Sequence, residues 1–114
     1  MTQTYIQRFG NKYNARRTGY HGTSYMSNKE AEYARELDMR KNGGDIKNWE
    51  KQVKLSLDVN GVHIANYFMD FVIEHNDGSF EAVEVKGFET EVWKMKWKLA
   101  MAIYGEKYTF TLIK

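Results

Sequence analysis

Residues 62–87, VHIANYFMDFVIEHNDGSFEAVEVKG, decide the fold of this chain. Segment 62–74 is apolar on both faces, which is typical of a central strand that is covered on both sides. Residues 76–78, Asn-Asp-Gly, fit a three-residue hairpin loop with glycine in the left-handed region, so we expect His75 to pair with Ser79. The returning strand covers 79–87.

The flanking segments predict two helices and two more strands. Ser27 and Glu30 form a capping box, which predicts a helix over 28–42 that ends at Gly43 and Gly44. A strand over 46–58 leads through an Asn60-Gly61 turn into the central strand. Thr90 precedes a helix over 91–104, closed by Gly105, and a last strand covers about 107–113.

The predicted order is therefore α-β-β-β-α-β, an α/β (α+β) fold in which three strands form an antiparallel meander. The length of 114 residues fits one domain, and residues 1–25 have no sustained period, which indicates an N-terminal arm.

Composition excludes several classes of protein. The chain has no cysteine, which excludes a disulfide framework, a thiolate zinc site and a cysteine nucleophile and makes the cytoplasm the default location. No signal peptide or membrane-spanning segment is predicted, because the longest apolar-rich segment, 62–73, is interrupted by polar residues.

Charge is distributed unevenly along the chain. The net charge of +2 is the sum of +5 over residues 1–29, −6 over residues 30–84 and +3 over residues 85–114. Basic ends suit a polyanion, and an acidic middle suits a site that needs carboxylates, although a solvated acidic surface is the commoner explanation.

Two carboxylates break their local patterns. Glu30 lies on the helix stripe that carries Tyr33, Ala34 and Leu37, within about 60° of each, so it is expected on the buried side unless it only completes the capping box. Asp70 interrupts the apolar central strand. A buried carboxylate costs several kcal/mol unless a cation or hydrogen-bond donors meet it, and a purely structural, hydrogen-bonded Asp is the alternative.

The hairpin register brings a second carboxylate to Asp70. Glu84 and Lys86 share one face of their strand, and the three-residue loop places Asp70 opposite Glu84 and Phe68 opposite Lys86. Paired carboxylate oxygens are typical ligands of a hard divalent cation. A register change of one residue would move Asp70 to the other face.

This arrangement resembles the PD-(D/E)XK nuclease superfamily, and within it small phage-encoded proteins similar to Holliday junction resolvases. The similar stretches are residues 25–31, 68–71, 83–90 and the lysine-rich helix segment 93–99, and the resemblance as a whole extends over residues 25–114, most of the chain. The chain departs from the nominal pattern because Met69, and not proline, precedes Asp70. The resemblance implies a restriction-endonuclease-like core, a mixed sheet flanked by helices.

The resemblance also implies roles for individual residues. Asp70, Glu84 and the backbone carbonyl of Val85 would bind Mg²⁺, with Mn²⁺ as an expected substitute, and Glu30 would complete the metal site. Lys86 would orient the attacking water or help to deprotonate it. Gln52 is a further candidate for a polar contact in the site.

Basic residues are candidates for contacts with DNA phosphates. Lys94 and Lys98 lie one turn apart on the second helix, although a solvated lysine face explains them equally well. The arm carries four further candidates, interleaved with tyrosines: Arg8, Lys12, Arg16 and Arg17.

The expected function is a Mg²⁺-dependent, structure-selective DNA endonuclease, a Holliday junction resolvase that acts as a homodimer. If the protein is encoded by a phage, it would work in the bacterial host cytoplasm. Two alternatives stay open: a less selective nuclease for duplex or flap DNA, and a DNA-binding module that has lost its chemistry.

Overall fold

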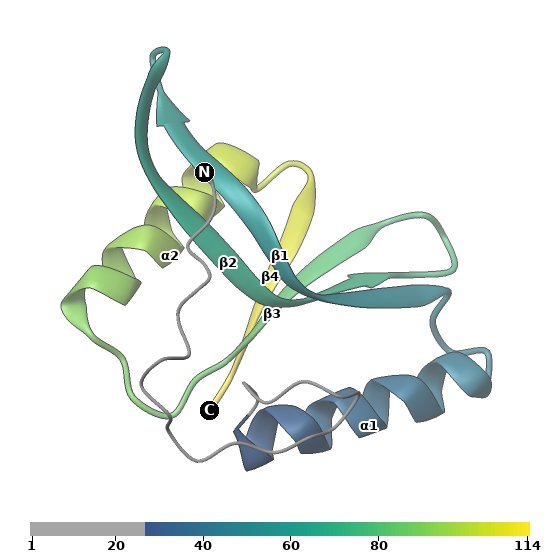
Figure 1. The fold of residues 1–114 in the computed structure, drawn as a ribbon. Coiled ribbons are helices and arrows are strands. Elements are labelled where there is room, and N and C mark those ends of the chain that lie inside the picture. The colour runs from purple at the N-terminus through teal and green to yellow at the C-terminus, as the bar shows by residue number, and fades with distance from the viewer. Residues whose placement is uncertain (1–26) are drawn as a thin grey trace. The chain divides into compact units, whose positions relative to one another are not determined.

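A computed structural model describes residues 27–114 (Figure 1). The chain divides within its first helix, between Glu36 and Leu37, into two units that are described separately. The elements are α1 (Asn28–Asn42), β1 (Asn48–Val59), β2 (Val62–Glu74), β3 (Phe80–Val85), α2 (Glu91–Tyr104) and β4 (Tyr108–Ile113). This confirms the α+β class and the order α-β-β-β-α-β.

The four strands form one mixed sheet in the order β1-β2-β3-β4. β1, β2 and β3 are antiparallel neighbours, as the meander predicts, and β4 lies parallel to β3. α2 connects the parallel pair. Its residues Trp93 and Ala100 are buried in a cluster with Leu55 and Leu57 of β1 and Tyr67 of β2, so α2 packs on β1 and β2.

Both helices begin as their capping residues predict. The Ser27 N–H donates to Glu30 Oε1 at 2.9 Å and the Glu30 N–H donates to Ser27 Oγ at 3.1 Å, which is the reciprocal capping box. Thr90 caps α2, because its hydroxyl accepts from the Trp93 N–H at 3.1 Å. Gly44 follows α1 at φ +85°, in the left-handed region that glycine favours.

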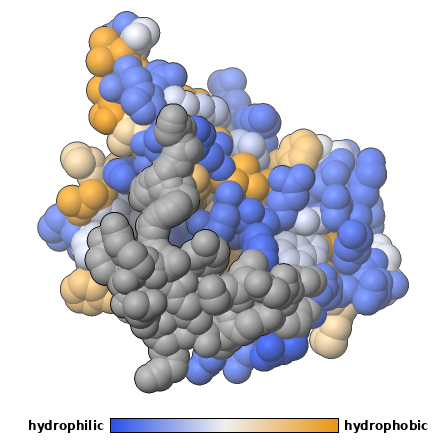
Figure 2. Space-filling view, in the orientation of Figure 1, coloured by the Kyte–Doolittle hydropathy of each residue, from blue (hydrophilic) through white to orange (hydrophobic). Residues whose placement is uncertain are grey.

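The first part of β2 is less covered than predicted. Val62 is 58% exposed and Ile64 is 54% exposed, and Figure 2 shows apolar surface at the tip of the β1–β2 hairpin. The expectation of a strand covered on both faces is wrong here, since β3 pairs only with residues 71–74 and the hairpin extends beyond it. Pairing also stops before Phe68 and Lys86, so these two residues do not lie opposite each other.

The alternation of faces along β2 changes around Asp70. Tyr67, Met69 and Val72 all belong to the buried cluster that contains Trp93 and Ala100 of α2, whereas strict alternation places Val72 on the opposite face of β2 from Tyr67 and Met69. On β1, Gln52 occupies the ladder position across from Asp70 and has φ +53°, which is unusual for a residue other than glycine. This local break in β1 lies beside the change of face in β2.

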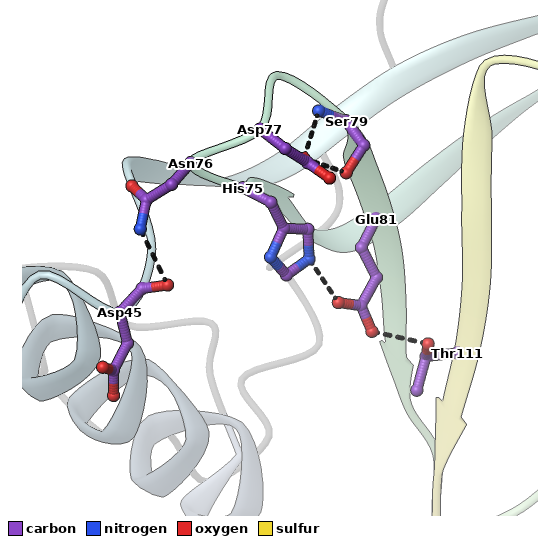
Figure 3. A network of polar contacts seen from close by, with 7 residues as sticks. All are labelled: Asp45, His75, Asn76, Asp77, Ser79, Glu81 and Thr111. Atoms are coloured by element: carbon purple, nitrogen blue, oxygen red, sulfur yellow. Dashed lines mark hydrogen bonds and ion pairs between the residues drawn. The ribbon is translucent and has the colours of Figure 1, made fainter.

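The turn between β2 and β3 has the predicted register. The His75 N–H donates to the Ser79 carbonyl at 2.8 Å, and Gly78 has φ +91°. Figure 3 shows Asp77 accepting from both the N–H and the hydroxyl of Ser79, at 2.9 and 2.7 Å. Asn76 donates to the Gly44 carbonyl at 2.9 Å. These contacts fix the loop that sets which residues of β2 and β3 face each other.

This turn gives a prediction for the titration of Asp77. The side-chain hydrogen bond from Ser79, with the backbone bond from the same residue, lowers the pKa of Asp77 below 3.8. A depressed carboxyl pKa contributes stability above pH 3.8 that is lost as pH falls through the lower, folded-state value. We expect Ser79→Ala to raise the pKa of Asp77 towards 3.8, as measured by NMR titration, and to leave that of Asp58 unchanged. An unchanged Asp77 pKa would contradict this account of the turn.

Candidate functional site

Two buried carboxylates lie where β2 and β3 separate. Asp70 is 8% exposed and Glu84 is 4% exposed. The last paired residues of the two strands are Phe71 and Val83, so the next register position places Asp70 across from Glu84, as predicted. Beyond this point β2 continues only beside β1 and β3 only beside β4 (Figure 1).

Where the backbone pairing of β2 and β3 ends, the Asp70 side chain bonds to the backbone of β3 instead. Its Oδ2 accepts a hydrogen bond from the Val85 N–H at 2.9 Å, and its Oδ1 accepts from Gln52 Nε2 at 3.3 Å. Gln52 is therefore in contact with the site. The two donors lower the cost of burying the Asp70 carboxylate.

Glu84 is held by a phenol and an ammonium group. The Tyr67 hydroxyl donates to Glu84 Oε1 at 2.6 Å, and Lys86 Nζ lies 3.9 Å from Glu84 Oε2. Burial raises the pKa of Tyr67 far above its usual value, and the charge of Glu84 adds to the rise. Tyr67 therefore stays protonated and acts as a hydrogen-bond donor.

Lys86 also lies over an aromatic ring of α2. Its Nζ is 5.1 Å from the centroid of the Trp93 ring, within the range of a cation–π interaction. The Trp93 indole N–H is buried and has no hydrogen-bond partner among residues 27–114. It lies near the Tyr67 hydroxyl and lowers the pKa of Tyr67, against the larger effects of burial and of Glu84.

The oxygen atoms at this position suit a hard cation. The Lys86 N–H pairs with the Ile113 carbonyl of β4 at 2.8 Å, whereas the Val85 N–H points to Asp70. Because the N–H and C=O of one strand residue point to the same side, we expect the Val85 carbonyl to face Asp70 as well. Two carboxylates and a carbonyl are oxygen ligands of the kind that Mg²⁺ binds.

The described residues supply two acidic side chains and no larger cluster. Among residues 27–114, no group of three or more His, Asp or Glu side chains lies close enough together to hold a metal ion. Glu30 belongs to the unit of residues 1–36, while Asp70 and Glu84 belong to the other unit. Its capping role is confirmed, and its role at the metal stays a prediction.

The structure describes some of the candidate DNA-binding residues and not others. Lys94 and Lys98 are exposed on α2, and Lys94 Nζ lies 3.4 Å from Glu91 Oε2. Lys96, which lies between them in the sequence, donates to the Asn66 carbonyl of β2 at 3.3 Å. The arm residues lie outside the described part of the chain: Arg8, Lys12, Arg16 and Arg17.

The sequence did not single out Tyr67 and Trp93 as site residues. Both have the apolar pattern expected of core positions, and both are buried. Strict alternation would also place Tyr67 on the face of β2 opposite to Asp70. Only the change of face beside Asp70 brings its hydroxyl to Glu84, so no local sequence signal identifies it.

Comparison with known proteins identifies a family. The family model described as "Protein of unknown function (DUF1064)" matches residues 10–114. The chain belongs to this family. The match to DUF1064 includes Asp70, Glu84 and Lys86 and the whole of the sheet. No curated protein and no solved structure matches the chain. Among the described residues of this DUF1064 member, no helix is long and apolar enough to span a membrane.

Proposed function

We propose that this protein is a Mg²⁺-dependent DNA endonuclease that hydrolyses phosphodiester bonds. The observation that carries the proposal is the buried pair Asp70 and Glu84, accompanied by Lys86, at the point where β2 and β3 separate. Burying two carboxylates directly across from each other on neighbouring strands is unfavourable unless positive charge compensates them. A bound divalent cation would supply that charge.

The chemistry of phosphodiester hydrolysis suits these groups. Mg²⁺ bound by Asp70, Glu84 and the Val85 carbonyl would act as a Lewis acid that makes water more acidic and neutralises phosphate charge. Lys86 carries a positive charge 3.9 Å from Glu84 Oε2 and would stabilise the charge that develops on the phosphate. Its position also allows it to orient the attacking water. Gln52 and the Val85 N–H keep the Asp70 carboxylate in place.

The proposed substrate is branched DNA, in particular the four-way Holliday junction. This part of the proposal rests on the resemblance to resolvase-like proteins of the PD-(D/E)XK superfamily and on the basic ends of the chain. Each chain provides one Asp70–Glu84 pair, whereas symmetric resolution needs two nicks. The proposed active form is therefore a homodimer. The exposed Lys94 and Lys98 and the basic arm would contact DNA phosphates.

A cleavage assay tests the proposal. The protein is incubated with Mg²⁺ and either a labelled synthetic four-way junction or a linear duplex of matched sequence, and products are separated on a denaturing gel. We expect paired nicks in the junction and little cleavage of the duplex. The test variant is Glu84→Gln, which alters a proposed metal ligand. Glu81→Gln is its matched control, since Glu81 lies on the same strand and contacts His75 and Thr111.

Other outcomes would point to the alternatives. Equal cleavage of junction and duplex would favour a less selective nuclease. Binding of DNA without cleavage and without Mg²⁺ binding would favour a non-catalytic DNA-binding module. Cleavage that is as fast with Glu84→Gln as with the wild type would overturn the proposed site.

A further inference from the structure

Two aromatic side chains touch the charged groups of the site from different elements. Tyr67, on β2, donates a hydrogen bond of 2.6 Å to Glu84 Oε1. Trp93, on α2, presents its ring to Lys86 Nζ at 5.1 Å from the centroid. Both aromatic side chains are buried, at 4% and 9% exposure, so the surrounding core holds each of them in place.

We propose that Tyr67 and Trp93 are positioning residues, Tyr67 for the Glu84 carboxylate and Trp93 for the Lys86 ammonium group. The inference rests on the proposed function, because it assigns these contacts to metal binding and to phosphate hydrolysis.

The Tyr67 contact fixes one oxygen of a flexible side chain. With Oε1 held by the phenol, the second oxygen, Oε2, is turned towards Lys86. A metal ligand that is held in place before the metal arrives binds it more tightly, and loss of such a supporting hydrogen bond typically weakens metal affinity about 10- to 100-fold. Tyr67 itself is not proposed to touch the metal.

The Trp93 contact restrains the longest side chain of the site. Lys86 is partly exposed, at 26% of its side chain, and a free lysine samples many rotamers. The ring of Trp93 is in turn stacked on Trp97, with centroids 5.4 Å apart, so it is a fixed surface. The ammonium group is thus kept near Glu84.

Metal titration tests the role of Tyr67. Binding of Mn²⁺ to the full chain is measured by calorimetry for the wild type, Tyr67→Phe and Tyr104→Phe. Tyr104 is the matched control, because its hydroxyl donates to the Ser56 carbonyl at 2.7 Å within the same core. We expect the Mn²⁺ dissociation constant to rise about 10-fold or more in Tyr67→Phe and to stay within about twofold of the wild type in Tyr104→Phe.

A second measurement tests the role of Trp93 without metal or DNA. The indole N–H resonance of Trp93 is identified by its absence from the NMR spectrum of Trp93→Phe. We expect Lys86→Met to shift this resonance. Lys107→Met is the control, because Lys107 lies over another ring, that of Tyr108, at 5.3 Å. An unshifted Trp93 resonance in Lys86→Met would overturn the proposed contact.

Kinetics separate positioning from general stabilisation. On the junction substrate, Trp93→Phe keeps an aromatic surface under Lys86 and should retain most of kcat, whereas Trp93→Leu should lower kcat with little change in KM. A similar loss in Trp93→Phe and Trp93→Leu would indicate a packing role only, and would overturn the assignment.

Different results would overturn the proposed function and the positioning role of Tyr67. If the wild type binds no Mn²⁺, both the proposed function and this inference are overturned. If the wild type binds Mn²⁺ and cleaves the junction but Tyr67→Phe binds Mn²⁺ equally well, the proposed function stands and the role of Tyr67 is overturned.

Discussion

Asp70→Asn is expected to reduce Mg²⁺-dependent cleavage of the junction about 10³-fold, because the Lewis-acid contribution of a bound metal is several kcal/mol and about 4 kcal/mol corresponds to that factor. The substitution removes the charge and keeps the size of the side chain. The remaining carbonyl oxygen can still accept from the Val85 N–H, which Asp70 Oδ2 accepts at 2.9 Å. The fold should therefore survive.

The cleavage rate is measured in single-turnover reactions on the labelled junction, and Mn²⁺ binding is measured by calorimetry. Asp38→Asn is the control: Asp38 is a partly buried carboxylate that accepts from Trp49 Nε1 at 3.0 Å and is not a proposed metal ligand. It should cleave at the wild-type rate. If the Asp70→Asn rate stays within about tenfold of the wild-type rate, the Asp70 carboxylate lowers the activation free energy by less than about 1.4 kcal/mol. Asp70 is then a structural residue.

Lys86→Met is expected to lower the cleavage rate about 10²- to 10⁴-fold, the usual contribution of a positioned group that transfers or holds a proton. Metal binding should not weaken, because the substitution removes a positive charge that lies 3.9 Å from a proposed ligand atom, Glu84 Oε2. Methionine keeps an unbranched, apolar side chain and removes only the charged end, which lies over the Trp93 ring.

A loss of rate without a loss of Mn²⁺ affinity would identify Lys86 as a catalytic residue. Rates on the junction and Mn²⁺ dissociation constants are measured on the same samples, with Lys107→Met as the control for loss of a lysine beside an aromatic ring. A parallel loss of rate and of Mn²⁺ affinity would mean that Lys86 supports the metal ligands and does not act on the substrate.

Much of the fold can be predicted from local patterns in the sequence. The bounds 28–42 and 91–104 of the helices agree with the structure because Ser27, Glu30 and Thr90 satisfy backbone groups within one turn of themselves. The β2–β3 register agrees because Asn76, Asp77 and Gly78 specify a single type of loop. That register already places Asp70 next to Glu84.

Other features depend on contacts between segments that are distant in the sequence. Val62 and Ile64 look like core residues, yet they are exposed because β3 ends its pairing before it reaches them. The left-handed backbone at Gln52 has no sequence signature, since glutamine rarely adopts that conformation. The change of face along β2 therefore cannot be read from strict alternation.

The sequence by itself determined the order of the elements, the pairing of β2 with β3 and the candidate trio Asp70, Glu84 and Lys86, because turns, caps and the period of a strand act over a few residues. Only the tertiary structure decided how these groups are held. Tyr67 reaches Glu84 because β2 changes face, and Trp93 reaches Lys86 because α2 packs on the sheet. Burial and long-range packing, which set these contacts, are properties of the folded chain and not of any one segment.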